Sequence, residues 1–84
     1  MIINVVVYNE EIIPIQVDKY KNTLNDLFSK LNEKRRNKIT VPRLITIGGM
    51  PVKYEEFSKY LNNFDLEDGF SIFISKYYDG WIFF

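Results

Sequence analysis

The side chains that could carry out chemistry in this chain of 84 residues are mainly its paired carboxylates. Neighbouring acids occur at Glu10-Glu11, Glu55-Glu56 and Glu67-Asp68, and such pairs can act as general acid and base or as oxygen ligands for a cation. We interpret them as solvated turn residues, because nothing in the sequence around them indicates burial or a shifted pKa. The sequence contains no histidine and no cysteine. We therefore expect no enzyme, no metal site and no cofactor.

A basic cluster, KRRNK, occupies Lys34 to Lys38. It could bind a phosphate group or an acidic partner, but we favour an ordinary solvated helix end, where cations suit the negative end of the helix dipole. Gly48-Gly49 is not a phosphate loop, because neither a lysine-hydroxyl tail nor a helix follows it. Eleven basic and eleven acidic residues cancel, so charge gives no argument for a nucleic acid or a membrane as partner.

One helix is expected at Thr23 to Lys34. Leu24, Leu27, Phe28 and Leu31 follow the spacing i, i+3, i+4 and i+7, which places all four on one face. Thr23 is the expected N-cap, with Asp26 three residues later in a weak capping box.

The remaining segments indicate strands and turns. Nearly every residue from Met1 to Tyr8 is apolar, as in a central strand, and the alternation from Ile12 to Val17 indicates a half-buried strand that Pro14 places at an edge. Further strands are expected at residues 43–47, 50–52 and 70–74. We expect turns at residues 9–11, 48–49 and 68–69, and a short helical turn at 54–60.

The order of these elements predicts a single α+β domain with a mixed sheet of four to five strands packed on one main helix. The first and last strands are the most apolar, so we expect them to pair in the centre of the sheet, in parallel, with the helix in the crossover connection. This arrangement is a β-grasp. The absence of cysteine and of a signal-peptide pattern leads us to expect a cytoplasmic protein.

The sequence resembles ubiquitin and its relatives over residues 1–80. The resemblance is carried by the apolar residues of the first hairpin, by Leu27 and Leu31 of the helix, by Arg43-Leu44-Ile45 followed by Gly48, by Phe57-Ser58-Lys59-Tyr60, and by residues 67–72. No single motif is specific to this family, but the motifs occur in the same order and with nearly the same spacing as in ubiquitin and its relatives. The resemblance implies a ubiquitin-like β-grasp fold.

The resemblance also implies a function as a protein modifier. A modifier would be activated at a C-terminal glycine carboxylate and conjugated to target proteins through an isopeptide bond. Gly80 is the candidate glycine, so residues 81–84 would be an extension removed by a processing peptidase, and activating and conjugating enzymes would be the partners. The chain departs from the family pattern in having one glycine here and in the bulk of Tyr77 and Tyr78. Gly80 could instead be an ordinary turn glycine.

The alternative is a ubiquitin-like module that docks on a partner protein without conjugation. Lys76-Tyr77-Tyr78 is similar to the end of some docking-only relatives. In this case the aromatic end beginning at Trp81 would remain on the chain, packed on the domain or inserted into a partner groove.

For either function, the resemblance implies a recognition patch on the sheet face that points away from the helix. It places Ile45 and Phe73 in this patch, and strand alternation adds Ser71. Leu44 is the neighbour expected to face the core, and Arg43 would form part of a polar rim.

Overall fold

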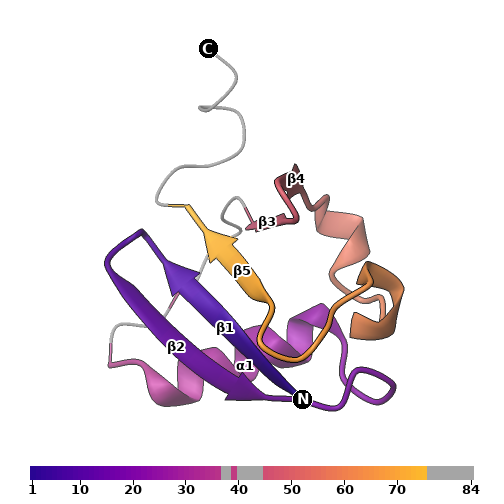
Figure 1. Ribbon diagram of the computed structural model, residues 1–84, viewed down its shortest axis with the longest axis horizontal. Helices are drawn as coiled ribbons and strands as arrows, with labels where there is room; N and C mark the ends of the chain where they lie inside the picture. Colours follow the sequence, from indigo (N-terminus) through magenta and orange to yellow (C-terminus); the bar gives the residue numbers. More distant parts are fainter. Residues whose placement is uncertain (37–38, 40–44, 76–84) are drawn as a thin grey trace.

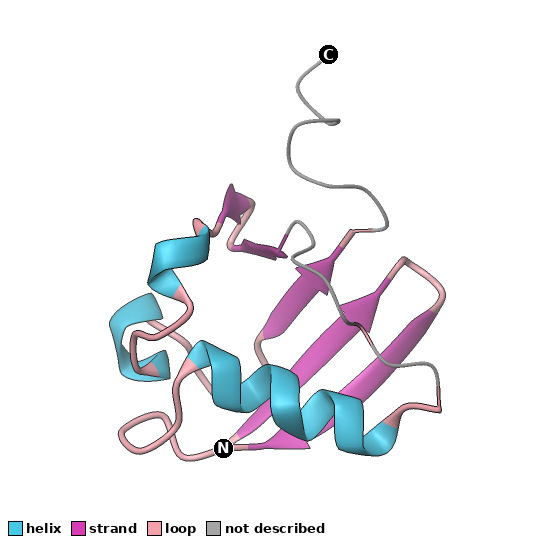
Figure 2. Ribbon diagram, turned by 180° about the vertical axis from the view of Figure 1, so that it is seen from behind, coloured by secondary structure: helices cyan, strands magenta, loops and turns pink. Residues whose placement is uncertain are grey.

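A computed structural model describes residues 1–36, 39 and 45–75 of the chain (Figure 1). Five strands form one mixed sheet, with one main helix against it and two short 3₁₀ helices beside it (Figure 2). The predicted α+β fold with a β-grasp arrangement is confirmed. The bounds are β1 (Ile2–Val7), β2 (Glu11–Gln16), α1 (Leu24–Lys34), β3 (Ile45–Ile47), β4 (Met50–Pro51), η1 (Tyr54–Glu56), η2 (Leu61–Phe64) and β5 (Ser71–Ile74).

The strand order in the sheet is β2-β1-β5-β3-β4. β1 lies in the interior of the sheet and pairs in parallel with β5, as predicted, while the other neighbours are antiparallel. α1 lies in the connection from β1 to β5, because a parallel pair needs a crossover. Burial alternates strictly along β1, so only one of its faces is buried.

The helix begins and ends close to the predicted bounds. Thr23 is its N-cap: the Thr23 hydroxyl accepts from the Asp26 backbone N–H at 3.1 Å, and the Asp26 carboxylate accepts from the Thr23 N–H at 2.8 Å. This capping box satisfies two donors that the first turn would otherwise leave unpaired. The hydrogen bond from the Thr23 N–H holds the pKa of the Asp26 carboxyl below its ordinary value.

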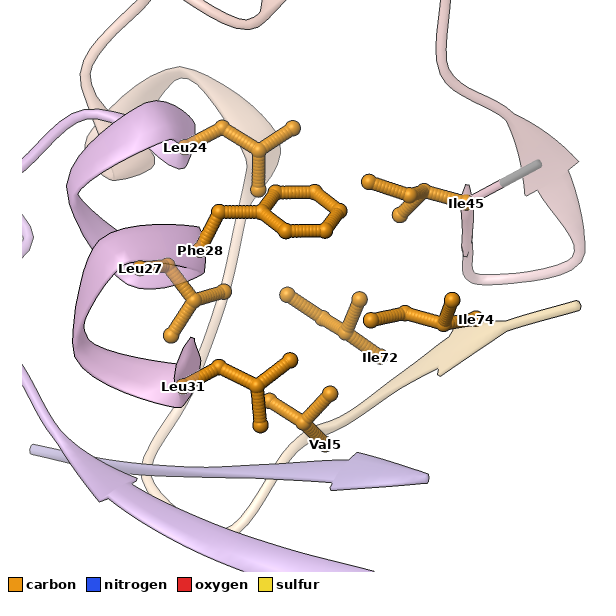
Figure 3. A pocket seen from close by; sticks show the side chains of 8 residues that line it. All are labelled: Val5, Leu24, Leu27, Phe28, Leu31, Ile45, Ile72 and Ile74. Carbon is orange, nitrogen blue, oxygen red and sulfur yellow. The ribbon is translucent and has the colours of Figure 1, made fainter. Parts of the chain in front are cut away.

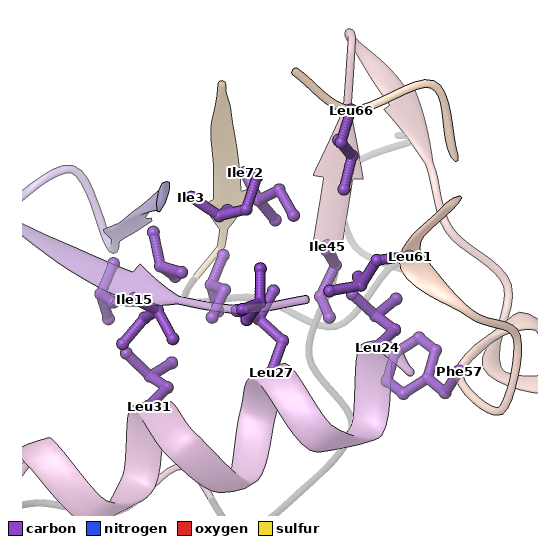
Figure 4. Packing of buried hydrophobic residues seen from close by; sticks show 14 of the residues in the cluster. Ile3, Ile15, Leu24, Leu27, Leu31, Ile45, Phe57, Leu61, Leu66 and Ile72 are labelled. Carbon is purple, nitrogen blue, oxygen red and sulfur yellow. The ribbon is translucent and has the colours of Figure 1, made fainter. Parts of the chain in front are cut away.

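The core lies between α1 and the inner face of the sheet (Figure 4). Leu24, Leu27 and Leu31 are buried as predicted. Phe28 is only partly buried, and its ring stacks on Phe57 with centroids 5.7 Å apart. The sheet and the 3₁₀ region supply the other large, fully buried side chains, which are Ile3, Val5, Val7, Ile15, Ile45, Leu61, Leu66 and Ile72.

The turns agree with the sequence apart from small shifts. The first hairpin turns at Tyr8 and Asn9, both with φ of 57°, so Glu11 is already in β2 rather than in the turn. Gly48 and Gly49 connect β3 to β4 with φ of 60° and 81°. These are left-handed values at which glycine has no steric penalty.

Candidate functional site

The candidate site is the face of the sheet that points away from α1, which we call the outer face. The helix covers the opposite face, and no helix of the described residues covers the face that is turned to the viewer in Figure 1. The pairing register decides which side chains share this face, because directly paired residues of neighbouring strands point the same way.

One row of paired residues crosses the whole sheet on the outer face. Val6 of β1 pairs with Ile12 of β2 on one side and with Phe73 of β5 on the other. Phe73 pairs with Thr46 of β3, which pairs in turn with Pro51 of β4. We call these five residues, of which only Thr46 is polar, the apolar row. Ile12 is 67% exposed and Phe73 is 45% exposed.

The paired residues beside the apolar row on the same face include polar and apolar side chains, and none of them is charged. Asn4 pairs with Pro14 on one side and with Ser71 on the other, and Ile2 pairs with Gln16. No residue in these rows is charged, although 26% of the chain is. The side chains of these paired rows therefore offer van der Waals contact and a few amide and hydroxyl groups, but no charged group for an ion pair.

Phe73 and Ser71 lie on the outer face as predicted, but the prediction for Ile45 is wrong. Ile45 is 1% exposed and points into the core toward Phe28 (Figure 3). Its partner in the register is the buried Ile74, so both point inward, and Thr46 takes the position expected for Ile45. The alternation of Ile45, Thr46 and Ile47 indicates this orientation, because the polar Thr46 lies between two isoleucines and therefore faces outward when they face the core.

The other predicted site residues lie outside the described residues. They are Arg43 of the rim, Leu44, and the tail residues Tyr77, Tyr78, Gly80 and Trp81.

The described part of the basic cluster is bound to β2. Lys34 Nζ donates to the Pro14 carbonyl at 3.1 Å, and the Arg35 guanidinium pairs with the Glu11 carboxylate. Lys34 and Arg35 lie at the end of α1, and Lys38 lies outside the described residues.

Members of the acidic pairs accept hydrogen bonds from the backbone. The Asp68 carboxylate accepts from the Ile2 N–H at 2.6 Å, and the Glu56 carboxylate accepts from the Lys53 N–H at 3.1 Å. Within residues 1–36, 39 and 45–75, no three potential metal ligands of the Asp, Glu, His or Cys types come together.

A small cavity between α1 and the sheet has about 10 Å³ of free space, room for roughly one water molecule (Figure 3). Its lining is entirely apolar, so it offers a ligand no polar contact. A larger open hollow of about 310 Å³ lies at the end of β2, beside Met1, Gln16 and Tyr20.

No family model matches the sequence, and the comparison with curated proteins gives no match. None of the helices in the described part of the chain is long and apolar enough to cross a membrane.

Proposed function

We propose that this chain is a β-grasp module that recognises a partner protein by docking, without catalysis, and that the outer face is the binding surface. The observation that supports it is the apolar row. A row of five uncharged residues across the whole sheet, including Ile12 and Phe73 with much of their surface in water, buries apolar area when a partner covers it.

The partner that fits this surface is the apolar side of an amphipathic helix. Neighbouring strands lie about 4.8 Å apart, so successive residues of the apolar row repeat at about that distance. Successive turns of a helix repeat at about 5.4 Å. A helix lying across the strands can therefore place one apolar side chain near each strand, and its polar side remains in water.

The absence of charged residues from the paired rows of the outer face supports the same partner. An acidic or basic side chain at the centre of such an interface would lose water and find no counter-charge. The outer face therefore favours a partner helix whose contacting side is uncharged, and it disfavours helices that carry charged residues on that side.

A photo-crosslinking experiment tests the proposal. The crosslinker benzoylphenylalanine replaces Phe73 in the full chain within its host cells, and in a second strain it replaces Tyr54, which is 70% exposed on η1. We expect a protein that is crosslinked from position 73 and not from position 54, through an apolar segment of a helix. Equal crosslinking from the two positions would contradict the proposal.

A second candidate function is covalent modification through Gly80. The β-grasp fold and the end of β5 at Ile74 support it, because Gly80 then follows the last strand after a short segment. On this proposal a peptidase cuts after Gly80. An activating enzyme adenylates the new carboxylate with ATP and releases pyrophosphate. An enzyme thiol then displaces AMP to form a thioester, and the amine of a target lysine displaces the thiol to form an isopeptide bond. Docking of these enzymes would use the same outer face.

Covalent modification is tested with a chain that ends at Gly80, incubated with ATP and an activating enzyme encoded beside its gene. We expect a thioester with this chain, and none with the full-length chain or with one ending at Asp79. If no thioester forms with the chain ending at Gly80, docking alone remains.

A further inference from the structure

The β2 edge of the sheet has a proline at a position whose backbone points away from the sheet. The Val17 N–H donates to the Met1 carbonyl at 2.9 Å, and the Met1 ammonium donates to the Val17 carbonyl at 3.1 Å. Because antiparallel pairs alternate between bonded and non-bonded positions, Gln16, Pro14 and Ile12 direct their backbone groups outward. Pro14 has no N–H, so one outward donor is missing from the middle of β2.

The same placement of proline occurs at the other edge. The Val52 N–H donates inward to the Ile45 carbonyl at 2.8 Å. Its neighbour Pro51, in β4, therefore has its backbone directed outward, again without a donor.

Two of the three outward carbonyls of β2 accept hydrogen bonds from lysines of α1. Lys30 Nζ donates to the Gln16 carbonyl at 3.3 Å, and Lys34 Nζ donates to the Pro14 carbonyl at 3.1 Å. Lysines four residues apart lie on the same side of a helix, about 5–6 Å from each other, and carbonyls two residues apart on a strand are separated by about 6.7 Å. The two spacings match closely enough for each ammonium group to reach its own carbonyl.

We propose that Pro14, Lys30 and Lys34 together close the β2 edge against pairing with the β2 strand of a second copy of this chain. An incoming strand needs an alternating series of outward donors and acceptors. Here it would meet a missing donor at Pro14 and would have to displace two ammonium groups from the carbonyls. At β4, Pro51 and a strand of only two residues have the same effect.

The closure of the edges does not depend on which partner binds the outer face. With both edges closed, this protein would recognise a partner through a face of the sheet and not through main-chain pairing at an edge. It also explains why Lys30 and Lys34 extend toward β2 rather than into water.

The test compares two variants in the full chain. The edge variant carries Pro14→Val, Lys30→Met and Lys34→Met, which restores the outward donor and removes both ammonium groups. The control variant carries Pro14→Val with Lys21→Met and Lys53→Met, and therefore has the same composition but keeps the two lysines beside β2. Self-association is measured by sedimentation velocity from micromolar to millimolar concentration, and hydrogen exchange is measured at the Ile12 and Gln16 amides.

We expect the edge variant to self-associate at least about tenfold more strongly than the control variant, with slower exchange at both amides in the associated state. If the edge variant stays as monomeric as the control, or associates without protection of these amides, the proposal is wrong. Should the edge variant lose the fold by circular dichroism, the variant Pro14→Val with Lys30→Gln and Lys34→Gln decides the question. Association of this variant supports the proposal, and a monomer at all concentrations contradicts it.

Discussion

Leu27 projects from the middle of α1 into the core and is only 3% exposed. Its truncation in Leu27→Ala removes buried methyl groups and leaves a cavity that the surrounding side chains fill only in part. We expect a loss of about 2–5 kcal/mol in the free energy of unfolding, measured by urea denaturation. Asn25→Ala, on the exposed side of the same helix, is the control and should cost less than about 0.5 kcal/mol. Equal losses in the two variants would mean that the helix face is wrongly assigned.

Asp26 makes stability depend on pH in the acidic range. The hydrogen bond from the Thr23 N–H lowers the pKa of Asp26 in the folded state from the ordinary value of 3.8. The folded state therefore holds its proton less tightly than the unfolded state, and the stabilisation is present above the unfolded-state pKa. It is lost as the pH falls through the lower folded-state pKa.

Asp26→Ala removes the part of the folding stability that depends on ionisation of the Asp26 carboxylate. The thermal midpoints of the unchanged chain and of the variant should differ at neutral pH and converge as the pH falls below 3.8. A difference that stayed constant across this range would show that the carboxylate has no role in the cap beyond its shape.

At the scale of the element, the β3–β4 hairpin depends on its two glycines. Gly49 has φ of 81°, and a Cβ there would meet no atom within 4 Å, so a substitution is opposed by the backbone conformation and not by a clash. We expect Gly49→Ala to lower the free energy of unfolding by about 1–2 kcal/mol in chemical denaturation. Gly49→Asn should cost less, because asparagine enters the left-handed region more readily than alanine. If alanine and asparagine cost the same, this explanation of the turn is wrong.

The elements that the sequence predicted well are those specified by local signals. The α1 spacing and the cap at Thr23 lie within one stretch of chain, and turn residues such as Gly48-Gly49 have their own backbone preference. The 3₁₀ helix η2 was not predicted, because a helix this short has no hydrophobic period to detect.

The site could be predicted only in part, because it depends on pairing between distant segments. The side of the sheet that Ile45 faces is fixed by its register with Ile74, and a one-residue change of phase moves a side chain to the opposite face. The resemblance to ubiquitin places Ile45 on the outer face, with Leu44 facing the core, whereas Ile45 is buried in the structure. The contacts of Lys30 and Lys34 with β2 span 14 and 20 residues of sequence, and no local pattern indicates them.

In the whole molecule, the two faces of the sheet differ in character. The inner face of the sheet and α1 form the core, and the outer face carries no charge in its paired rows. Prolines and lysines are placed at the sheet edges. On the docking proposal, a partner would bind the outer face and contact the uncharged side chains of its paired rows.

The measurement that tests this account most directly is the affinity of the crosslinked partner for variants of the outer face. Phe73→Ser removes an exposed aromatic ring from the centre of the apolar row, and Tyr54→Ser removes an exposed ring on η1. By calorimetric titration, we expect Phe73→Ser to weaken binding at least about tenfold, or about 1.4 kcal/mol, and Tyr54→Ser to leave it unchanged. If Phe73→Ser binds as tightly as the unchanged chain while Tyr54→Ser binds more weakly, the binding surface is not the outer face.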